Sequence, residues 1–310
     1  MDAYARSWFQ MRFQNKFLRL KGAAFQDFFA DIMSRRHPSD FIRTRPWGNS
    51  GDRKNDGYLR SERILYQVYA PNELTAREAV SKIEEDFAEA LPYWQEFFGK
   101  WMFVHNALDG LGPEVLKCLL ELDRRQEGID VRHMGYESLE ETALGLSQHH
   151  LEVLLGYAPD ARAFSNVRSS DLIKVLDMLA REDILGDIDP QPVSLDKIHK
   201  NSLSDESKFY LRMGQRKSGL VARIFDTFSD PLSAEGIVQG FRNRYTDLKL
   251  QDIQSDRILG ELICHAGGYA EHYKGGPVEA QRHEAAVAAI LAYLFERCDI
   301  FEDPMEDSIT

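Results

Sequence analysis

The feature that most constrains the fold is a short run of branched and aromatic residues, Ile64–Tyr69 (ILYQVY), between two helical patterns. Branched and aromatic side chains favour extended backbone, so this run predicts a strand. Apolar residues recur at helical spacing over 7–36, where Gly22 is a candidate break. A second helical pattern covers 73–98, where Pro92 predicts a kink or break. A strand between two helices indicates an α/β arrangement in this part of the chain.

Other segments extend this alternation. A helix is expected to begin at Pro113, because proline is tolerated in the first helical turn. The order predicted over residues 1–135 is helix, strand, strand, strand, helix, strand, helix, strand. The predicted strands are residues 41–45, a segment after Asp56, and residues 64–69, 101–105 and 129–134.

Helical patterns dominate beyond residue 140, and the last of them places Val287, Ile290, Leu291, Leu294 and Cys298 on one face. Residues 185–200 hold two prolines and no clear period, which predicts a linker. We therefore predict an α+β chain with an α/β N-terminal domain and a mostly α-helical C-terminal domain. The predicted ranges are 1–160 for the first domain, 161–200 for a helical connector and linker, and 201–310 for the second domain.

Cysteine usage and hydropathy indicate a cytoplasmic protein. Cys118, Cys264 and Cys298 are widely spaced and form no C-x-x-C pair, which disfavours a disulfide framework or a zinc ribbon. No apolar run approaches the ~18 residues that a membrane span needs. The N-terminus lacks the apolar core of a signal peptide. We expect no membrane partner.

Charge is unevenly distributed along the chain, whose formal net charge is −12. Residues 1–60 hold 12 Lys and Arg against 6 Asp and Glu, a net of +6, and the remainder holds 26 against 44, a net of −18. A basic segment on an acidic body can form a local phosphate-binding surface. The alternative is that basic residues only decorate a long amphipathic helix.

The stretch richest in chemistry is residues 51–69, GDRKNDGYLRSERILYQVY. Asp56 precedes a strand-like segment, and Gln67 follows eleven residues later in the next strand, a distance that suits a hairpin. Side chains at i and i+2 of a strand share a face, so Gln67 and Tyr69 lie on one face. Mg²⁺ prefers oxygen ligands and keeps several waters, so few protein ligands suffice.

This arrangement resembles the PD-(D/E)XK nuclease superfamily and, within it, the Mrr-type restriction domains. Their pattern is close to G-D-x-x-x-D-G followed by a strand with Q-x-K, and the matching residues here are Gly51, Asp52, Asp56, Gly57 and Gln67. The resemblance implies a restriction-endonuclease-like fold that cuts DNA with Mg²⁺ or Mn²⁺. It implies catalytic roles for Asp56, Gln67 and Asp52. The family's helical acidic ligand corresponds to the region of Gln26 and Asp27, so the implied metal ligands are Asp56, Gln67 and Asp27.

The sequence departs from this pattern at Tyr69, where the family has lysine. A phenol is neutral near pH 7 and cannot replace an ammonium in charge stabilisation. Either the site is inactive or another cation serves. Superfamily members sometimes carry the lysine on the following helix, which makes Lys82 the first substitute and Lys54 a weaker one. Lys82 could instead be an ordinary exposed helix residue paired with Asp86 at i+4.

Cations near this stretch are candidates for nucleic-acid binding, and those expected to contact phosphates are Arg43, Arg45, Arg53 and Lys54. A plainer explanation exists for the acidic residues. Asp52 and Asp56 flank a glycine-containing turn, where aspartate is common for backbone hydrogen bonding alone.

The C-terminal half carries a second resemblance. Residues 195–305, including KIHKNSLSDESKFYLRMGQRKSGLV and AAVAAILAYLFERCDIFEDP, resemble the C-terminal domain of prokaryotic ABC-three-component conflict systems. This resemblance implies docking to an ABC-type ATPase and a small middle component. No P-loop or other nucleotide fingerprint occurs, so no nucleotide cofactor is expected in this chain. The sequence leaves open whether the chain forms a homo-oligomer.

Two functions follow from these patterns. The first is a Mg²⁺-dependent DNA endonuclease of a phage-defence system, in which Lys82 replaces the missing lysine. The second is a nuclease-fold sensor without catalysis, which binds nucleic acid or a phage component and signals to the ATPase. A purely structural role is a third alternative. Whether Lys82 reaches the Asp56–Gln67 site separates the first two.

Overall fold

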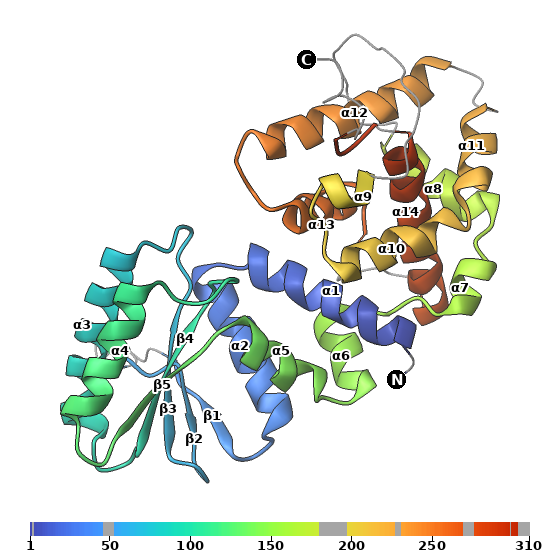
Figure 1. Cartoon of the computed structure of the whole chain (residues 1–310). Helices are drawn as coiled ribbons and strands as arrows, with labels where there is room; N and C mark the ends of the chain where they lie inside the picture. Colours follow the sequence, from blue (N-terminus) through green and yellow to red (C-terminus); the bar gives the residue numbers. More distant parts are fainter. Residues whose placement is uncertain are drawn as a thin grey trace. The chain divides into compact units, whose positions relative to one another are not determined.

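A computed structural model describes residues 1, 3–45, 53–179, 197–226, 231–268, 276–297 and 299–302. The chain splits into two compact units (Figure 1). Lys16–Leu154 form one, here called the sheet unit, and Met1–Asn15 with Leu155–Thr310 form the other, here called the helical unit. No helix in the described ranges is both long and apolar enough to cross a membrane.

The sheet unit contains, among its described residues, a five-stranded mixed sheet in the order β1-β2-β3-β4-β5 (Figure 1). Strands β1, β2 and β3 pair antiparallel, whereas β3, β4 and β5 pair parallel. The predicted α+β class and the predicted order of strands are therefore confirmed. The strands are β1 Phe41–Arg43, β2 Gly57–Leu59, β3 Ile64–Tyr69, β4 Lys100–His105 and β5 Asp130–Met134.

Helices cover both faces of this sheet. Helices α3 and α4 lie on one face, and α2 and α5 lie on the other (Figure 1). The α3/α4 side is a buried apolar core that includes Leu65, Ile83 and Trp101. The helices are α2 Gly22–Arg36, α3 Ala76–Trp94, α4 Pro113–Arg125, α5 Tyr136–Leu144 and α6 Gln148–Leu155.

Glycine and proline act at the predicted places, with one correction. The N-terminal helical pattern divides into α1 (Ala3–Arg19) and α2, and Gly22 has a φ of +51°, which glycine adopts without the penalty of a side chain. Pro92 does not break α3, which continues to Trp94. The proline lies so close to the helix end that few backbone hydrogen bonds depend on it.

The helical unit is built around α14, which contacts α7, α8, α10, α11 and α13. Val287, Ile290, Leu291 and Leu294 of the predicted apolar face are buried, and Cys298 lies outside the described ranges. Burial also extends to the other sides of the helix, over Ala285–Phe295 apart from the half-buried Tyr293. Alanines around the helix let neighbouring helices approach closely from several directions. The surrounding helices are α7 Ala161–Ser165, α8 Ser169–Leu179, α9 Lys197–Lys200, α10 Asp205–Gln215, α11 Ser218–Asp226, α12 Pro231–Lys249 and α13 Ser255–His265, with α14 spanning Pro277–Glu296.

Buried charges hold the helical unit together. Arg12 and Glu284 form an ion pair at 3.3 Å, with both side chains buried. Lys197 donates from Nζ to the carbonyl of Phe295 (3.0 Å), in the last turn of α14, and to that of Ile300 (2.5 Å), just beyond the helix. A lysine is favourable there because the last carbonyls of a helix lack intrahelical donors. The predicted linker therefore does not extend to residue 200, since 197–200 form a helix anchored by a buried lysine; its residues 185–196 lie outside the described ranges.

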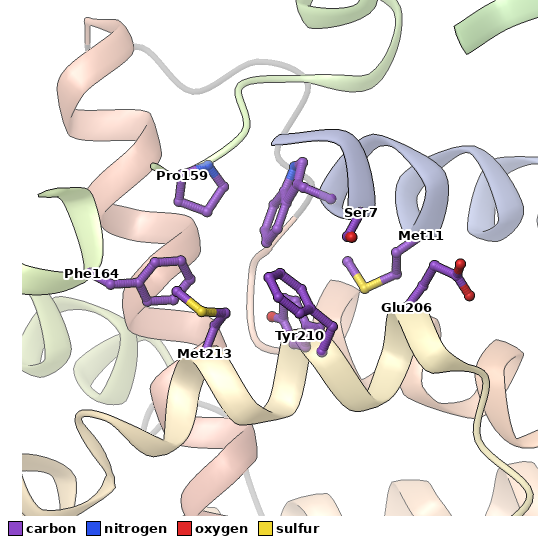
Figure 2. A pocket seen from close by; sticks show the side chains of 9 residues that line it. Ser7, Met11, Pro159, Phe164, Glu206, Tyr210 and Met213 are labelled. Carbon is purple, nitrogen blue, oxygen red and sulfur yellow. The ribbon is translucent and has the colours of Figure 1, made fainter. Parts of the chain in front are cut away.

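Several aromatic residues of the C-terminal half belong to the core. Tyr210, Phe241 and Phe295 are buried. Figure 2 shows a small apolar pocket of about 10 Å³ lined by Tyr210 and Met213 of α10, Met11 of α1 and Phe164 of α7. Its volume suits about one water molecule. The pocket therefore has no room for an organic ligand.

The contact between α10 and α14 gives a stability prediction. A Cβ atom at Gly214 would overlap the backbone carbonyl of Ala288, which cannot move aside as a flexible side chain could. We predict that Gly214→Ala lowers the free energy of unfolding by about 1–3 kcal/mol, although alanine favours helices. Urea unfolding measures this change.

The matched control is Gly219→Ala in α11, where a Cβ atom meets nothing within 4 Å. It should leave stability unchanged or raise it by up to about 1 kcal/mol. Equal effects of the two substitutions would contradict the close approach of α10 to α14.

Candidate functional site

A pocket of about 330 Å³ lies where β3 ends in the sheet unit. It combines segments that are far apart in sequence: the start of α2, the loop before β2, the end of β3 and the first half of α3. Three of the predicted site residues, Lys54, Gln67 and Lys82, line it together. The other lining residues are Gly22, Gln26, Val68, Tyr69, Ala70 and Pro71.

Asp56 is held beside Gln67 by the predicted hairpin. The Asp56 backbone N–H donates to the carbonyl of Tyr66 at 2.9 Å, and its Oδ2 accepts from the N–H of Val68 at 2.7 Å. The Asp56 carboxylate is thus fixed against the backbone that carries Gln67. It does not itself line the pocket described above.

Gln67 is buried, with 5 % of its surface exposed. Its Oε1 makes no hydrogen bond with any described residue. A buried acceptor without a donor costs about 1–3 kcal/mol, so such atoms are rare in native folds. A ligand or an ordered water in the pocket would satisfy this oxygen.

Lys82 and Lys54 converge on one carboxylate oxygen. Oδ1 of Asp86 accepts from Lys82 Nζ at 2.7 Å and lies 3.0 Å from Lys54 Nζ, although Asp86 is fully buried. The i+4 pairing of Lys82 with Asp86 is the one expected from helical spacing. Lys54 also donates to Glu85 at 2.7 Å. Burial alone would lower the pKa of Lys54, but its hydrogen bonds to Glu85 and Asp86 outweigh burial and raise it.

Tyr69 lines the pocket, at the position where the nuclease pattern that the sequence resembles has lysine. Its ring lies 6.1 Å from the ring of Phe103. Burial, with a further contribution from the charges of Glu78 and Asp86, raises the pKa of the phenol above its ordinary value. Tyr69 is therefore neutral near pH 7 and supplies no positive charge.

The predicted helical metal ligand Asp27 is not among the residues that line the pocket. Its carboxylate pairs with Arg43 and lies 3.9 Å from Arg45, and the side chain is 61 % exposed. Two of the predicted phosphate-binding arginines are therefore engaged with Asp27. Its neighbour Gln26 lines the pocket instead.

The remaining predicted residues lie elsewhere. Arg53 stacks over the ring of Tyr93 at 5.4 Å, at the far end of α3. Asp52 and Gly51 lie outside the described ranges. Within the part of the chain that the structure describes, no three His, Cys, Asp or Glu side chains gather as a metal site. Asp56 and Gln67 offer two oxygen ligands, and Mg²⁺, which keeps several waters, can be held by so few.

A histidine pair at the ends of β4 and β5 was not predicted from the sequence. His105 Nδ1 accepts from the N–H of Ala107 at 3.3 Å, so its Nε2 carries the proton and points at His133 Nδ1, 3.2 Å away. The pair forms because β4 and β5 are parallel and end side by side. The amide of Asn106, the residue after β4, donates to the carbonyl of Pro71 at 3.2 Å and so ties the end of β4 to the pocket rim.

This pair predicts a pH-dependent stability. Burial, and then the proximity of His133, lower the pKa of His105 to about 4, and burial also lowers the pKa of His133. The unfolded chain binds the proton near pH 6.5, so the folded state loses stability as the pH falls from about 6.5 towards 4 and keeps it fully above 6.5. We predict a loss of up to about 3 kcal/mol across this window.

Urea unfolding between pH 7 and 4.5 measures this loss, with His105→Gln as the comparison. The variant should be less stable at pH 7 and should show a shallower decline with falling pH. An identical pH slope in both proteins would show that His105 does not cause the acid sensitivity.

Comparison with known proteins bears on the other half of the chain. No curated protein and no solved structure matches the chain. Residues 170–302, which are less than half of the chain, match the C-terminal domain 10 of the ABC-three component (ABC-3C) systems. The resemblance predicted for the C-terminal half is therefore confirmed, and this domain indicates that the chain is a component of an ABC-three-component system.

Proposed function

We propose that the chain is the DNA-acting component of a prokaryotic ABC-three-component conflict system and that its sheet unit hydrolyses phosphodiesters. The observation that carries the proposal is the position of Lys82. This lysine lies on α3, yet it lines the same pocket as Gln67 of β3. An ammonium is therefore available at the pocket, although the strand position of the nuclease pattern holds Tyr69.

The residues of the proposed site divide into two chemical sets. Asp56 and Gln67 would hold Mg²⁺ or Mn²⁺, which when bound supplies charge stabilisation and an activated water. The unsatisfied Oε1 of Gln67 is the oxygen that such an ion would meet. Lys82 would orient the water or stabilise the charge that develops on the phosphate. Lys54 would contact the phosphate backbone.

The helical unit is proposed to bind the other components of the system. Its similarity to an ABC-three-component C-terminal domain covers residues 170–302. On this proposal the partners are an ABC-type ATPase and a small middle component, and ATP hydrolysis takes place in the ATPase. The helical unit then contributes recognition and the sheet unit contributes chemistry.

A second candidate is a sensor that binds DNA without cutting it. Two observations favour it. Tyr69 is neutral, and the Lys82 ammonium is hydrogen-bonded to the buried Asp86. A lysine held by a carboxylate can bind a phosphate even where no metal assembles for hydrolysis.

Cleavage of plasmid and phage DNA with Mg²⁺ or Mn²⁺, by the full chain alone and with its ATPase partner, tests the first function. We predict that Lys82→Ala and Asp56→Asn each reduce cleavage by at least about 100-fold, the scale of losing one charge-stabilising group. Lys117→Ala is the matched control, because Lys117 pairs with Glu121 at i+4 on α4 and is 76 % exposed. Its cleavage should equal that of the wild type.

A rescue experiment sharpens this test. Tyr69→Lys, introduced into Lys82→Ala, creates the Q-x-K strand pattern of the Mrr-type domains and should restore part of the cleavage. Cutting that survives in Lys82→Ala would remove Lys82 from the site. DNA binding without cutting by the wild type under every condition would support the sensor instead.

A further inference from the structure

The carboxylate of Asp86 lies on the apolar side of α3. Ile83 and Phe87, its neighbours on that side, are buried core residues, and Asp86 itself has no exposed surface. A buried carboxylate is costly unless cations and hydrogen bonds compensate it. Lys54 and Lys82 provide that compensation at a single oxygen, Oδ1. The other oxygen, Oδ2, makes no hydrogen bond with any described residue.

The two lysines differ in how their ammonium groups are engaged. Lys54 contacts Glu85, Asp86 and, at 3.6 Å, Glu89, so its charge is shared among three carboxylates. Among the described residues, Lys82 forms its ion pair with Asp86, and 31 % of its side chain is exposed. An ammonium has three N–H donors, so Lys82 retains donors for a ligand in the pocket.

A bent loop brings Lys54 to Asp86. Arg53 and Lys54 both have positive φ angles, +55° and +57°, which residues other than glycine adopt only at an energetic cost. The Nε1 of Trp94 donates to the carbonyl of Arg53 at 3.0 Å and holds that residue. Lys54 is held by its own ion pairs, including the one with Asp86. The loop conformation is thus stabilised by contacts whose effect is to place a second cation on Asp86.

We infer that Asp86 is a positioning residue: its buried carboxylate, balanced by Lys54, holds the Lys82 ammonium at the pocket so that Lys82 donates to a phosphate group. The inference rests on the proposed function in taking phosphate as the ligand class. An independent feature of the same pocket also indicates a ligand. Only 5 % of the surface of Gln67 is exposed, and its Oε1 lacks a hydrogen-bond donor among the described residues.

The phosphate could belong to a nucleic acid or be free, and the test separates the two. Inorganic phosphate and a short single-stranded DNA are titrated, in EDTA, into the full chain. The readouts are the ¹⁵Nζ resonance of Lys82 and the fluorescence anisotropy of the DNA. We predict that both ligands shift the Lys82 signal, and that DNA does so at the lower concentration because it offers several phosphates.

Asp86→Asn should weaken phosphate binding by about tenfold, the scale of one charge-assisted hydrogen bond that is no longer aligned. It should also move the Lys82 resonance in the absence of ligand, which a purely structural role at a distance would not do. Glu121→Gln is the matched control, since it removes the i+4 carboxylate partner of Lys117 on α4. It should change neither readout.

If Asp86→Asn does not fold, the phosphate titration of the wild type tests the inference. Phosphate that shifts Lys82 but not Lys117 supports the inference, and phosphate that shifts both equally or neither overturns it. Wild-type affinity for phosphate in Asp86→Asn would also overturn it.

The outcomes also separate this inference from the proposed function. Phosphate binding that depends on Asp86, in a chain that never cuts DNA, removes the cleavage proposal and retains the positioning role. DNA cutting by Asp86→Asn at the wild-type rate removes the positioning role and retains the cleavage proposal.

Discussion

The burial of one carboxylate, Asp86, determines how the sheet unit is arranged around its pocket. Helix α3 packs on the sheet through Ala79, Ile83 and Ala90, and Asp86 lies among them with no exposed surface. Because an ionised group cannot stay there uncompensated, two lysines must reach it. One comes from the same helix and the other from the loop before β2, so the carboxylate fixes the loop, the helix and the pocket wall at once.

The charge cluster lies near the end of β3, the strand at which the sheet changes from antiparallel to parallel pairing. On its antiparallel side, the hairpin with β2 holds the Asp56 carboxylate on the backbone N–H of Val68. On its parallel side, β4 ends level with β3, and Asn106, the residue after β4, donates to the carbonyl of Pro71. An acidic group, an amide oxygen and two ammonium groups are thereby gathered around the end of one strand.

Local periodicity was enough to predict the strands, the shared face of Gln67 and Tyr69, and the pairing of Lys82 with Asp86. Each depends on residues two or four apart, whose relative positions secondary structure fixes. The approach of Lys54 to Asp86, the buried Lys197 and the all-round burial of α14 depend on tertiary packing. A sequence pattern on one segment does not reveal which distant segment lies against it. Asp27 shows the same limit: the resemblance to Mrr-type domains implied a metal ligand there, but the neighbouring strand presents Arg43 to it.

Charge balance bears on how nucleic acid could reach this pocket. The chain has a formal net charge of −12, and the pocket's two lysines are balanced by Asp86 and by the exposed Glu85 and Glu89. Long-range attraction of a polyanion is therefore weak, and few counterions would be released on binding. On the proposed function, recognition would come from short-range contacts, in which Lys82 would meet a phosphate at hydrogen-bond distance. On the proposed function, another component of the system would bring the DNA close to the pocket.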